Sequence, residues 1–267
     1  MALPSVPRFG SLFPDPLNVR RGIPLYYLKS EEENRRDVYE RYDELVARQT
    51  ALHLADELHG GYPLRKVSDY IRQWLPDLAD AAAVDIGCSV GRQIADIAGG
   101  HPNWDCYGLD FSYQMVRQAQ DYWKEGKTLN PNLLRFGYPT VALQGQVLPN
   151  LHFALADAKT LPFPDRSLDL IVNTFLIDRL PDLSATFAEW LRVLKPGGRL
   201  ITISPLNFLQ LDHWRQHYPP MKIIDPLLRD GWDLLDLTDP LMIHEPMDAR
   251  GNEVVWKTLA FVVESPC

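Results

Sequence analysis

VDIGCSVGR, at residues 84–92, is the stretch of sequence that decides the fold. The apolar run at its start, AAAVDIG at 81–87, predicts a buried strand, and GRQIADIA at 91–98 predicts a helix. Gly87 and Gly91 lie between the two and allow a tight turn, where the backbone and the helix N-terminus can approach a ligand closely. The stretch is therefore typical of a strand, a glycine turn and a helix that together bind a ligand.

Further strands and helices alternate along the chain after this turn. Strand patterns occur at 106–112, 151–157, 167–175 and 199–204, and helical patterns at 112–123 and 181–194. Ser112 is a candidate N-cap for the first of these helices. Two more strand patterns, at 231–246 and 254–265, flank a predicted turn at 249–252. Strands that alternate with helices indicate βαβ units, so we predict a doubly wound, Rossmann-like α/β fold with a mostly parallel sheet.

The N-terminal part of the chain has a different composition. Five prolines among residues 1–30 favour extended or irregular backbone. Apolar residues then recur at helical spacing over 31–58 and again over 67–75. We expect residues 1–80 to form an arm and a helical cap that belong to the same domain as the core at 81–267.

A long connection, residues 124–150, separates the second helix of the core from the next strand. Connections of this kind usually have about 2–6 residues. The glycines and prolines of the segment argue against one continuous helix, and long insertions near strand ends often serve as lids or binding loops. We therefore expect this insert to build an acceptor pocket together with the cap.

The composition is that of a globular protein, with 46% hydrophobic and 23% charged residues and a net charge of −8. The negative balance argues against a protein that binds duplex nucleic acid, because such a protein needs a basic face. No secretory signal precedes the core, and no run of about 18 apolar residues predicts a membrane span. Cys88, Cys106 and Cys267 show no metal-ligand or disulfide spacing. We expect a cytoplasmic protein with a small-molecule substrate, without a metal and without a nucleic-acid or membrane partner.

Acidic residues stand at the ends of three successive predicted strands. Asp85 ends the first strand, Asp110 the second and Asp157 the third. The carboxyl ends of parallel strands meet at one edge of a sheet, where ligands bind in this class of fold. Asp110 lies 19 residues after Gly91, and an acid in that place can accept hydrogen bonds from both hydroxyls of a ribose. Asp157 and the backbone N–H of Ala158 can contact an adenine edge, so the three acids predict a ligand that contains a nucleoside.

Three alternatives exist for the glycine turn. The dinucleotide fingerprint G-x-G-x-x-G does not match, because Ser89 stands between Gly87 and Gly91. The nucleophile elbow G-x-S-x-G does match, and it would make Ser89 the nucleophile of a serine hydrolase with a late histidine as its base. The late histidines are His213, His217 and His244. A tight turn without a ligand is the third alternative, but neither of the last two explains acids at three strand ends.

The stretch at 84–92 resembles the first motif of the class I S-adenosylmethionine-dependent methyltransferase family, with Ser89 in place of the more usual middle glycine. Three later stretches resemble further motifs of the family, namely YGLDFSYQMV at 107–116, LADAKTLPFPDRSLDLIV at 155–172 and VLKPGGRLITI at 193–203. The resemblance covers about residues 81–205. It implies a seven-stranded sheet with an antiparallel last strand, and S-adenosylmethionine as the cofactor.

The resemblance also implies a role for each matched residue. Asp85 would lie beneath the amino group of the methionine moiety, and Asp110 would bind the ribose hydroxyls. Asp157 and Ala158 would bind the adenine. The residues that would pack against the cofactor are Gly87, Cys88, Ser89 and Gly91 on its methionine and ribose side, and Phe111 or Met115 on the adenine face.

The segment after the fourth strand of the core, NTFLIDRLPD at 173–182, would face the transferred methyl group. Together with GCSVGR, it resembles the methyltransferase domain of ovothiol biosynthesis, which methylates a mercaptohistidine imidazole. Its F-x-I-D element is similar to the carnosine N-methyltransferases, in which the aspartate faces the substrate imidazole. The resemblance implies that Asp178 would accept the N–H of one ring nitrogen and leave the other free to attack. The alternative is that Asp178 and Arg179 only pair with each other or cap the next helix.

Several residues are candidates for binding the acceptor. Besides Asp178 as the catalytic residue, these are Arg179, Asn173, Phe175 and Tyr42. An amino-acid acceptor would need a cation for its carboxylate, and Arg179, Arg48 and Arg135 are the candidates. We predict a methyltransferase that acts on a small molecule, with N-methylation of an imidazole or histidine-type acceptor first. The alternatives are O- or N-methylation of a natural product or peptide, a serine hydrolase, and a silent module that only binds the donor.

Overall fold

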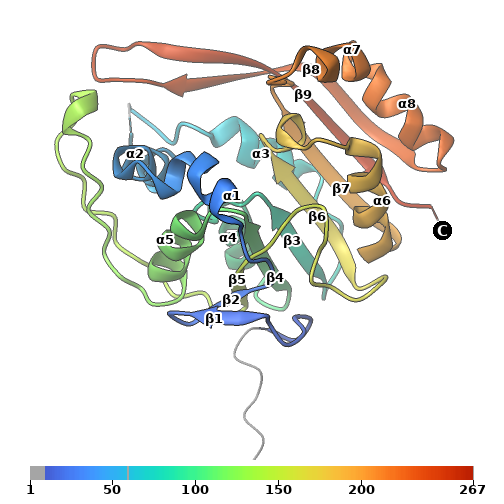
Figure 1. Ribbon diagram of the computed structural model, residues 1–267, viewed down its shortest axis with the longest axis horizontal. Coiled ribbons are helices and arrows are strands. Elements are labelled where there is room, and N and C mark those ends of the chain that lie inside the picture. Colours follow the sequence, from blue (N-terminus) through green and yellow to red (C-terminus); the bar gives the residue numbers. More distant parts are fainter. Residues whose placement is uncertain (1–9, 59, 267) are drawn as a thin grey trace, which may run out of the picture.

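The computed structural model describes residues 10–58 and 60–266, so the first nine residues of the predicted arm and Cys267 lie outside the described part of the chain. One sheet of nine strands forms the centre, in the order β1-β2-β5-β4-β3-β6-β7-β9-β8 (Figure 1). The strands are β1 Asn18–Arg20, β2 Ile23–Leu25, β3 Ala82–Ile86, β4 Asp105–Asp110, β5 Leu151–Leu155, β6 Leu168–Thr174, β7 Leu194–Ser204, β8 Asp233–Pro246 and β9 Glu253–Glu264.

The directions of the strands confirm a Rossmann-like α/β fold with a mostly parallel sheet. Strands β5, β4, β3, β6 and β7 run parallel to one another. Strand β9 is antiparallel to β7, and β8 is antiparallel to β9. The expected number of seven strands is wrong, because the N-terminal arm adds β1 and β2 beside β5. Each of these two strands has only three residues, which is too short a pattern to predict.

Helices cover both faces of the sheet and enclose two apolar clusters. Helices α2, α3, α4 and α5 bury Val46, Val67, Ile94 and Val116 in the first cluster, and α6 and α8 bury Phe187 and Ile224 in the second. The helices are α1 Glu31–Arg36, α2 Asp43–Leu54, α3 Arg65–Gln73, α4 Arg92–Gly100, α5 Tyr113–Trp123, α6 Leu183–Val193, α7 Leu211–His217 and α8 Met221–Arg229, with short 3-10 turns η1 Val38–Glu40, η2 Leu134–Phe136 and η3 Ile177–Arg179. Within residues 10–58 and 60–266, no helix has the length and apolar character that a membrane crossing requires.

The hairpin of β8 and β9 extends beyond the rest of the sheet. Residues 260–264 of β9 pair with both β7 and β8, Leu259 pairs with β7 alone, and residues 253–258 pair with β8 alone. The overhanging half reaches across the molecule toward the insert between α5 and β5 (Figure 1). The two segments meet where the N–H of Ala249, in the hairpin turn, donates to the carbonyl of Phe136, in the insert, at 2.9 Å.

Candidate active site

A pocket opens at the carboxyl ends of β3, β4, β5 and β6. The chain proceeds in opposite directions across the sheet from β3 and from β6, and ligands of open α/β sheets bind at such a switch point. The pocket has a volume of about 250 Å³. Its lining residues are Glu33, Ile86, Gly87, Leu109, Asp110, Phe111, Ala156, Asp157, Ala158, Lys159, Leu176, Arg179, Leu180 and Pro181. The pocket therefore brings together residues that the sequence predicts from three different strand ends.

The glycine turn between β3 and α4 is fixed against β4. The N–H groups of Gly87 and Cys88 both donate to the carbonyl of Leu109, at 2.8 and 2.9 Å. Gly91 has φ +79°, and a Cβ there would lie 2.4 Å from Cε1 of Phe153, so the position accepts only glycine. Because Gly87 has no side chain, its backbone remains exposed to the pocket that it lines.

Asp110, at the end of β4, connects the glycine turn to the next helix. Its Oδ2 accepts the N–H of Ser89 at 2.8 Å, and its Oδ1 accepts the N–H of Ser112 at 2.7 Å. Burial raises the pKa of Asp110, and these two hydrogen bonds oppose the rise. Each carboxylate oxygen can accept more than one hydrogen bond, so both remain able to accept from a ribose hydroxyl.

Asp85 is a buried acid with an unused oxygen. The residue is 1% exposed, and its Oδ1 has no hydrogen-bond partner among the residues that the structure describes. Burial, and then the charge of Asp110, raise the pKa of Asp85 to about 8. A buried acceptor without a donor costs about 1–3 kcal/mol. An ammonium group would supply both the donor and the opposite charge, so this oxygen fits the amino group of S-adenosylmethionine.

The opposite end of the pocket is formed at the end of β5. Asp157 accepts the backbone N–H of Lys159 at 3.0 Å and lies 3.2 Å from its ammonium nitrogen. The carbonyl of Ala158 accepts the indole N–H of Trp190 at 2.9 Å. These bonds hold residues 157–159 in place on the pocket wall, which they share with Phe111. The arrangement fits the flat adenine group that the sequence predicts here.

Comparisons with known proteins agree with this geometry. Residues 84–202 match the family model described as a methyltransferase domain. Over these residues, the chain is therefore similar to methyltransferase domains. The UbiE ubiquinone/menaquinone biosynthesis C-methyltransferase of Marinomonas sp. (strain MWYL1) is 34% identical over 117 residues, which span 44% of this chain and 44% of that protein. The UbiE protein of Serratia proteamaculans (strain 568) is 30% identical over 165 residues, which span 59% of this chain and 62% of that protein.

Solved structures share the fold of this methyltransferase domain. The [4+2]-cyclase SpnF has a TM-score of 0.57 at 16% identity, over 86% of this chain and 95% of that chain. S-adenosylmethionine is the cofactor of the methyltransferase family, and the pocket fits it. Because a cyclase has the same fold, the fold does not determine the reaction. The matched segments span less than two thirds of the length of the UbiE proteins.

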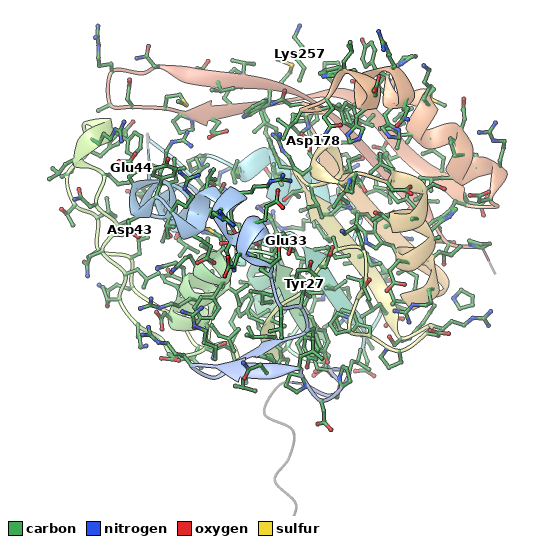
Figure 2. All side chains as sticks on the ribbon, in the orientation of Figure 1. Tyr27, Glu33, Asp43, Glu44, Asp178 and Lys257 are labelled. Carbon is green, nitrogen blue, oxygen red and sulfur yellow. The ribbon has the colours of Figure 1, made fainter. Side chains whose placement is uncertain are left out.

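The N-terminal arm covers the cofactor pocket of the methyltransferase domain, which the sequence does not predict. The ring of Tyr27 lies 5.3 Å from the ring of Phe111, and its hydroxyl donates to Glu33 at 2.7 Å (Figure 2). The ammonium of Lys29 lies 4.6 Å above Phe111 and 2.5 Å from Asp37. A capping box of Ser30 and Glu33 starts α1, and its S-x-x-E pattern is visible in the sequence. Nothing in that pattern indicates that Glu33 also lines the pocket.

The arm also replaces the predicted cap of α5. Ser112 occupies the N-cap position, but its side chain makes no capping hydrogen bond. The N–H of Tyr113 donates instead to Glu40, at 3.0 Å. An acidic side chain at a helix N-terminus is stabilised by the helix dipole, so this contact fastens η1 to the methyltransferase core.

Two of the predicted cofactor residues lie beneath the glycine turn. Cys88 and Met115 are 4% and 1% exposed, and neither lines the pocket. The hydroxyl of Ser89 lies 3.4 Å from the sulfur of Met115. The structure therefore places Met115 as support for the turn, and Phe111 is the aromatic residue on the pocket wall.

Asp178 and Asn173 do not occupy the positions that the sequence predicts. The carboxylate of Asp178 is fully buried and accepts from the hydroxyl of Ser204 at 3.1 Å and from the N–H of Asn207 at 3.2 Å. Asn173 is buried within β6 and donates to the hydroxyl of Thr202 at 2.8 Å. Neither side chain lines the cofactor pocket. The F-x-I-D pattern does not indicate that Ser204 and Asn207 donate hydrogen bonds to the carboxylate.

The other predicted acceptor residues are spread over three places. Arg179 lines the pocket and lies 3.6 Å from Asp178. The ring of Phe175 faces away from the pocket lining and packs against Trp256. Tyr42 is 43% exposed and contacts the guanidinium of Arg41 on the surface. Of the candidate cations, Arg135 pairs with Glu44 near the surface, and Arg48 pairs with Glu245 in a buried position.

Within residues 10–58 and 60–266, no hydrogen bond joins Ser89 to a histidine that could act as its base. The hydroxyl of Ser89 is directed at Met115, as described above, while His244 pairs with Glu253 at 3.0 Å on β8. His213 and His217, which are in α7, pack against the ring of Phe208. A nucleophilic serine needs a base within hydrogen-bonding distance, and these histidines are engaged elsewhere.

Asp85→Asn is expected to remove a pH dependence of stability and to weaken cofactor binding. The ordinary pKa of this carboxyl is 3.8, whereas burial raises it to about 8 in the folded protein. The folded state therefore holds a proton that the unfolded state has lost, so the stability of the wild type falls as the pH rises from about 5 to 8. Urea unfolding of the variant should lack this fall. Calorimetry should show S-adenosylmethionine binding weaker by about 10-fold, because a charged partner is lost.

The stability of the two proteins should thus converge at low pH and separate toward pH 8. Parallel curves for wild type and Asp85→Asn over that range would contradict the raised pKa. Unchanged cofactor affinity would contradict the contact between Asp85 and the amino group.

Proposed function

We propose that the protein transfers the methyl group of S-adenosylmethionine to a small-molecule acceptor. The observation that carries the proposal is the set of three acids, Asp85, Asp110 and Asp157, at three strand ends, of which Asp85 holds an unpartnered oxygen. One cofactor with an amino group, a ribose and an adenine would satisfy all three acids together. A glycine turn without a ligand, or a serine hydrolase site, would give none of the three acids a role.

The residues of this chain would act mainly by positioning. When bound, S-adenosylmethionine supplies a methyl group that the lone pair of an acceptor takes in an in-line displacement at carbon. Asp110 would hold the ribose, and Asp85 would hold the amino group of the methionine portion. Leu176, which lines the pocket, and the N-terminal arm would exclude water from the bound cofactor. Holding two reactants in the productive geometry can account for much of such a reaction's rate, about 7–11 kcal/mol of the barrier.

The acceptor that we propose first is an imidazole or histidine-type ring, because of the resemblance of the segment after β6. Asp178 would then support the backbone beside the acceptor, since its carboxylate is already engaged by Ser204 and Asn207. The second candidate is a ring carbon, because the UbiE relatives are named as C-methyltransferases. The family match ends at residue 202 and so leaves out the β8–β9 hairpin.

Two measurements test the proposal in sequence. Calorimetric titration with S-adenosylmethionine and with S-adenosylhomocysteine should show micromolar-range binding of each. Methyl transfer from labelled donor should then be measured on a panel of histidine, thiol-histidines, histidine dipeptides and hydroquinones. Label in a histidine compound supports the first acceptor, and label on a ring carbon of a hydroquinone supports the second. Absence of cofactor binding, together with covalent labelling of Ser89 by a fluorophosphonate, would replace the proposal with a hydrolase.

A further inference from the structure

The overhanging half of the β8–β9 hairpin lies over α2 and the end of β6. An isolated two-stranded hairpin is only marginally stable in water, so its inward face must be supported by contacts. Side chains alternate along a strand, which places Glu245 and Trp256 on the inward face and Lys257 on the outer face (Figure 2). The inward face therefore borders the region where ligands bind in this class of fold.

Glu245 is the centre of a half-buried polar cluster on this face. Its Oε1 accepts from the guanidinium of Arg48 at 2.6 Å, and its Oε2 accepts from the indole N–H of Trp256 at 2.7 Å. The side chains of Arg48 and Glu245 are only 15% and 14% exposed. The ring of Trp256 meets the ring of Phe175 edge to face, with centroids 6.0 Å apart. Two aromatic rings and one neutralised ion pair thus lie together in a half-buried position.

The cluster adjoins the cofactor pocket. Phe175 immediately precedes Leu176, which lines the pocket and lies close to Gly87. The phenol of Tyr39 interacts electrostatically with Asp110, which lines the cofactor pocket. It also interacts electrostatically with the Arg48–Glu245 pair of the cluster. A molecule held against the cluster would therefore lie beside the cofactor, on the side of β6.

His53, in the last turn of α2, is a buried imidazole with an unused nitrogen. Its Nδ1 has no hydrogen-bond partner among the described residues. Burial lowers the pKa of His53 to about 4, and Glu245 and Arg92 are the charged groups that interact with it. The ring is therefore neutral at physiological pH. A buried nitrogen without a partner is costly, which indicates a polar group supplied by a ligand.

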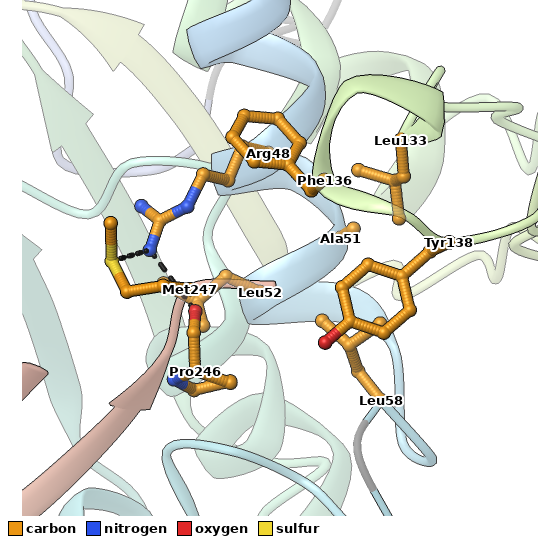
Figure 3. A pocket seen from close by; sticks show the side chains of 9 residues that line it. All are labelled: Arg48, Ala51, Leu52, Leu58, Leu133, Phe136, Tyr138, Pro246 and Met247. Carbon is orange, nitrogen blue, oxygen red and sulfur yellow. Dashed lines mark hydrogen bonds between the residues drawn. The ribbon is translucent and has the colours of Figure 1, made fainter. Parts of the chain in front are cut away.

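A second, smaller pocket beneath the hairpin tip is a packing joint. It lies where α2, the insert and the hairpin meet, between Arg48, Leu133, Phe136 and Met247 (Figure 3). Its volume of about 10 Å³ has room for no more than one water molecule. Arg48 also donates here to the carbonyl of Pro246 at 3.1 Å. This joint therefore fixes the guanidinium of Arg48.

We propose that Arg48, His53, Phe175, Glu245 and Trp256 form the acceptor-binding site, and that it takes an uncharged planar aromatic ring that carries an N–H or O–H group. The aromatic side chains match a flat ring, since aromatic pairs are favoured beyond their burial. The ion pair is neutral overall and would not favour a charge on the ring itself, while Glu245 and His53 can exchange hydrogen bonds with an N–H or O–H of that ring. The inference rests on the proposed methyl transfer, and it is compatible with both of its acceptor candidates.

Ligand-observed NMR titration of the full chain saturated with S-adenosylhomocysteine tests this site. The probes are imidazole and 1,4-hydroquinone, with cyclohexanol as a non-aromatic ring that carries an O–H. Both aromatic probes should bind, and cyclohexanol should not. Trp256→Leu and Glu245→Gln should each weaken binding by about 10-fold. Trp256→Phe keeps most of the packing and should lose less, whereas Lys257→Ala, on the outer face of the same strand, should bind as the wild type does.

The affinity for S-adenosylhomocysteine separates this inference from the proposed function. That affinity should stay within about twofold of wild type in all four variants, because none of the substituted residues lines the cofactor pocket. Aromatic probes that bind wild type and Trp256→Leu equally would overturn the acceptor site while the cofactor site stands. A wild type that does not bind S-adenosylhomocysteine would overturn the proposed function itself.

Discussion

Asp110→Ala is expected to weaken S-adenosylmethionine binding by about 100-fold or more, because charge-assisted hydrogen bonds contribute about 1.5–3 kcal/mol each. The carboxylate would lose its bonds to the ribose. It would also release the N–H groups of Ser89 and Ser112, which hold the glycine turn and the start of α5. Affinity and orientation of the cofactor should therefore both decline. Calorimetry measures the affinity, and circular dichroism reports whether the variant is folded.

Asp105→Ala is the matched control for this prediction. Asp105 is at the other end of the same strand, where it accepts a hydrogen bond from Ser11 at 2.5 Å. Its removal should leave cofactor affinity unchanged. Equal losses in the two variants would show that the effect arises from β4 as a whole. Wild-type affinity in a folded Asp110→Ala protein would contradict the role of Asp110.

Gly91→Ala is expected to destabilise the protein by about 3 kcal/mol or more, since overpacking and a strained backbone add together. The added Cβ would lie 2.4 Å from Cε1 and 2.6 Å from Cζ of Phe153, which is itself buried. The residue also has φ +79°, which an alanine adopts only at a cost. The measurement is the free energy of unfolding in urea.

Gly99→Ala provides the control in the same helix. A Cβ at Gly99 meets nothing within 4 Å, so alanine should be neutral or stabilise α4 by up to about 1 kcal/mol. The two substitutions add the same methyl group and should thus have opposite signs. A Gly91→Ala protein as stable as Gly99→Ala would mean that Phe153 or the turn relaxes freely.

The cofactor half of the site could be predicted from the sequence for a local reason. Asp85, Asp110 and Asp157 each stand at the end of a buried strand, and parallel strands bring such ends to one edge of the sheet. The roles of Cys88 and Met115 could not be separated in the same way. Both lie close in sequence to the turn, but only packing decides that their side chains point beneath it.

The acceptor half could not be predicted, because its residues come from segments far apart in the chain. Arg48 and Glu245 are separated by 197 residues and meet only because the β8–β9 hairpin extends over α2. Asp178 lies in a motif that resembles an acceptor site. Its carboxylate nevertheless accepts hydrogen bonds from Ser204 and Asn207, which follow it by 26 and 29 residues in the chain. A short motif shows which residue is present, but it does not show which distant residue will donate a hydrogen bond to it.

The sequence by itself determined the alternation of strands and helices, the glycine turn and the acids at three neighbouring strand ends, because these depend on residue type and periodicity within successive βαβ units. Only the tertiary structure decided that the N-terminal arm joins the sheet and closes the pocket, and that the hairpin overhang brings Glu245 and Trp256 beside Phe175. These contacts join segments whose sequence patterns do not indicate which other segment they will contact. They depend on which surfaces remain to be buried once the sheet has formed.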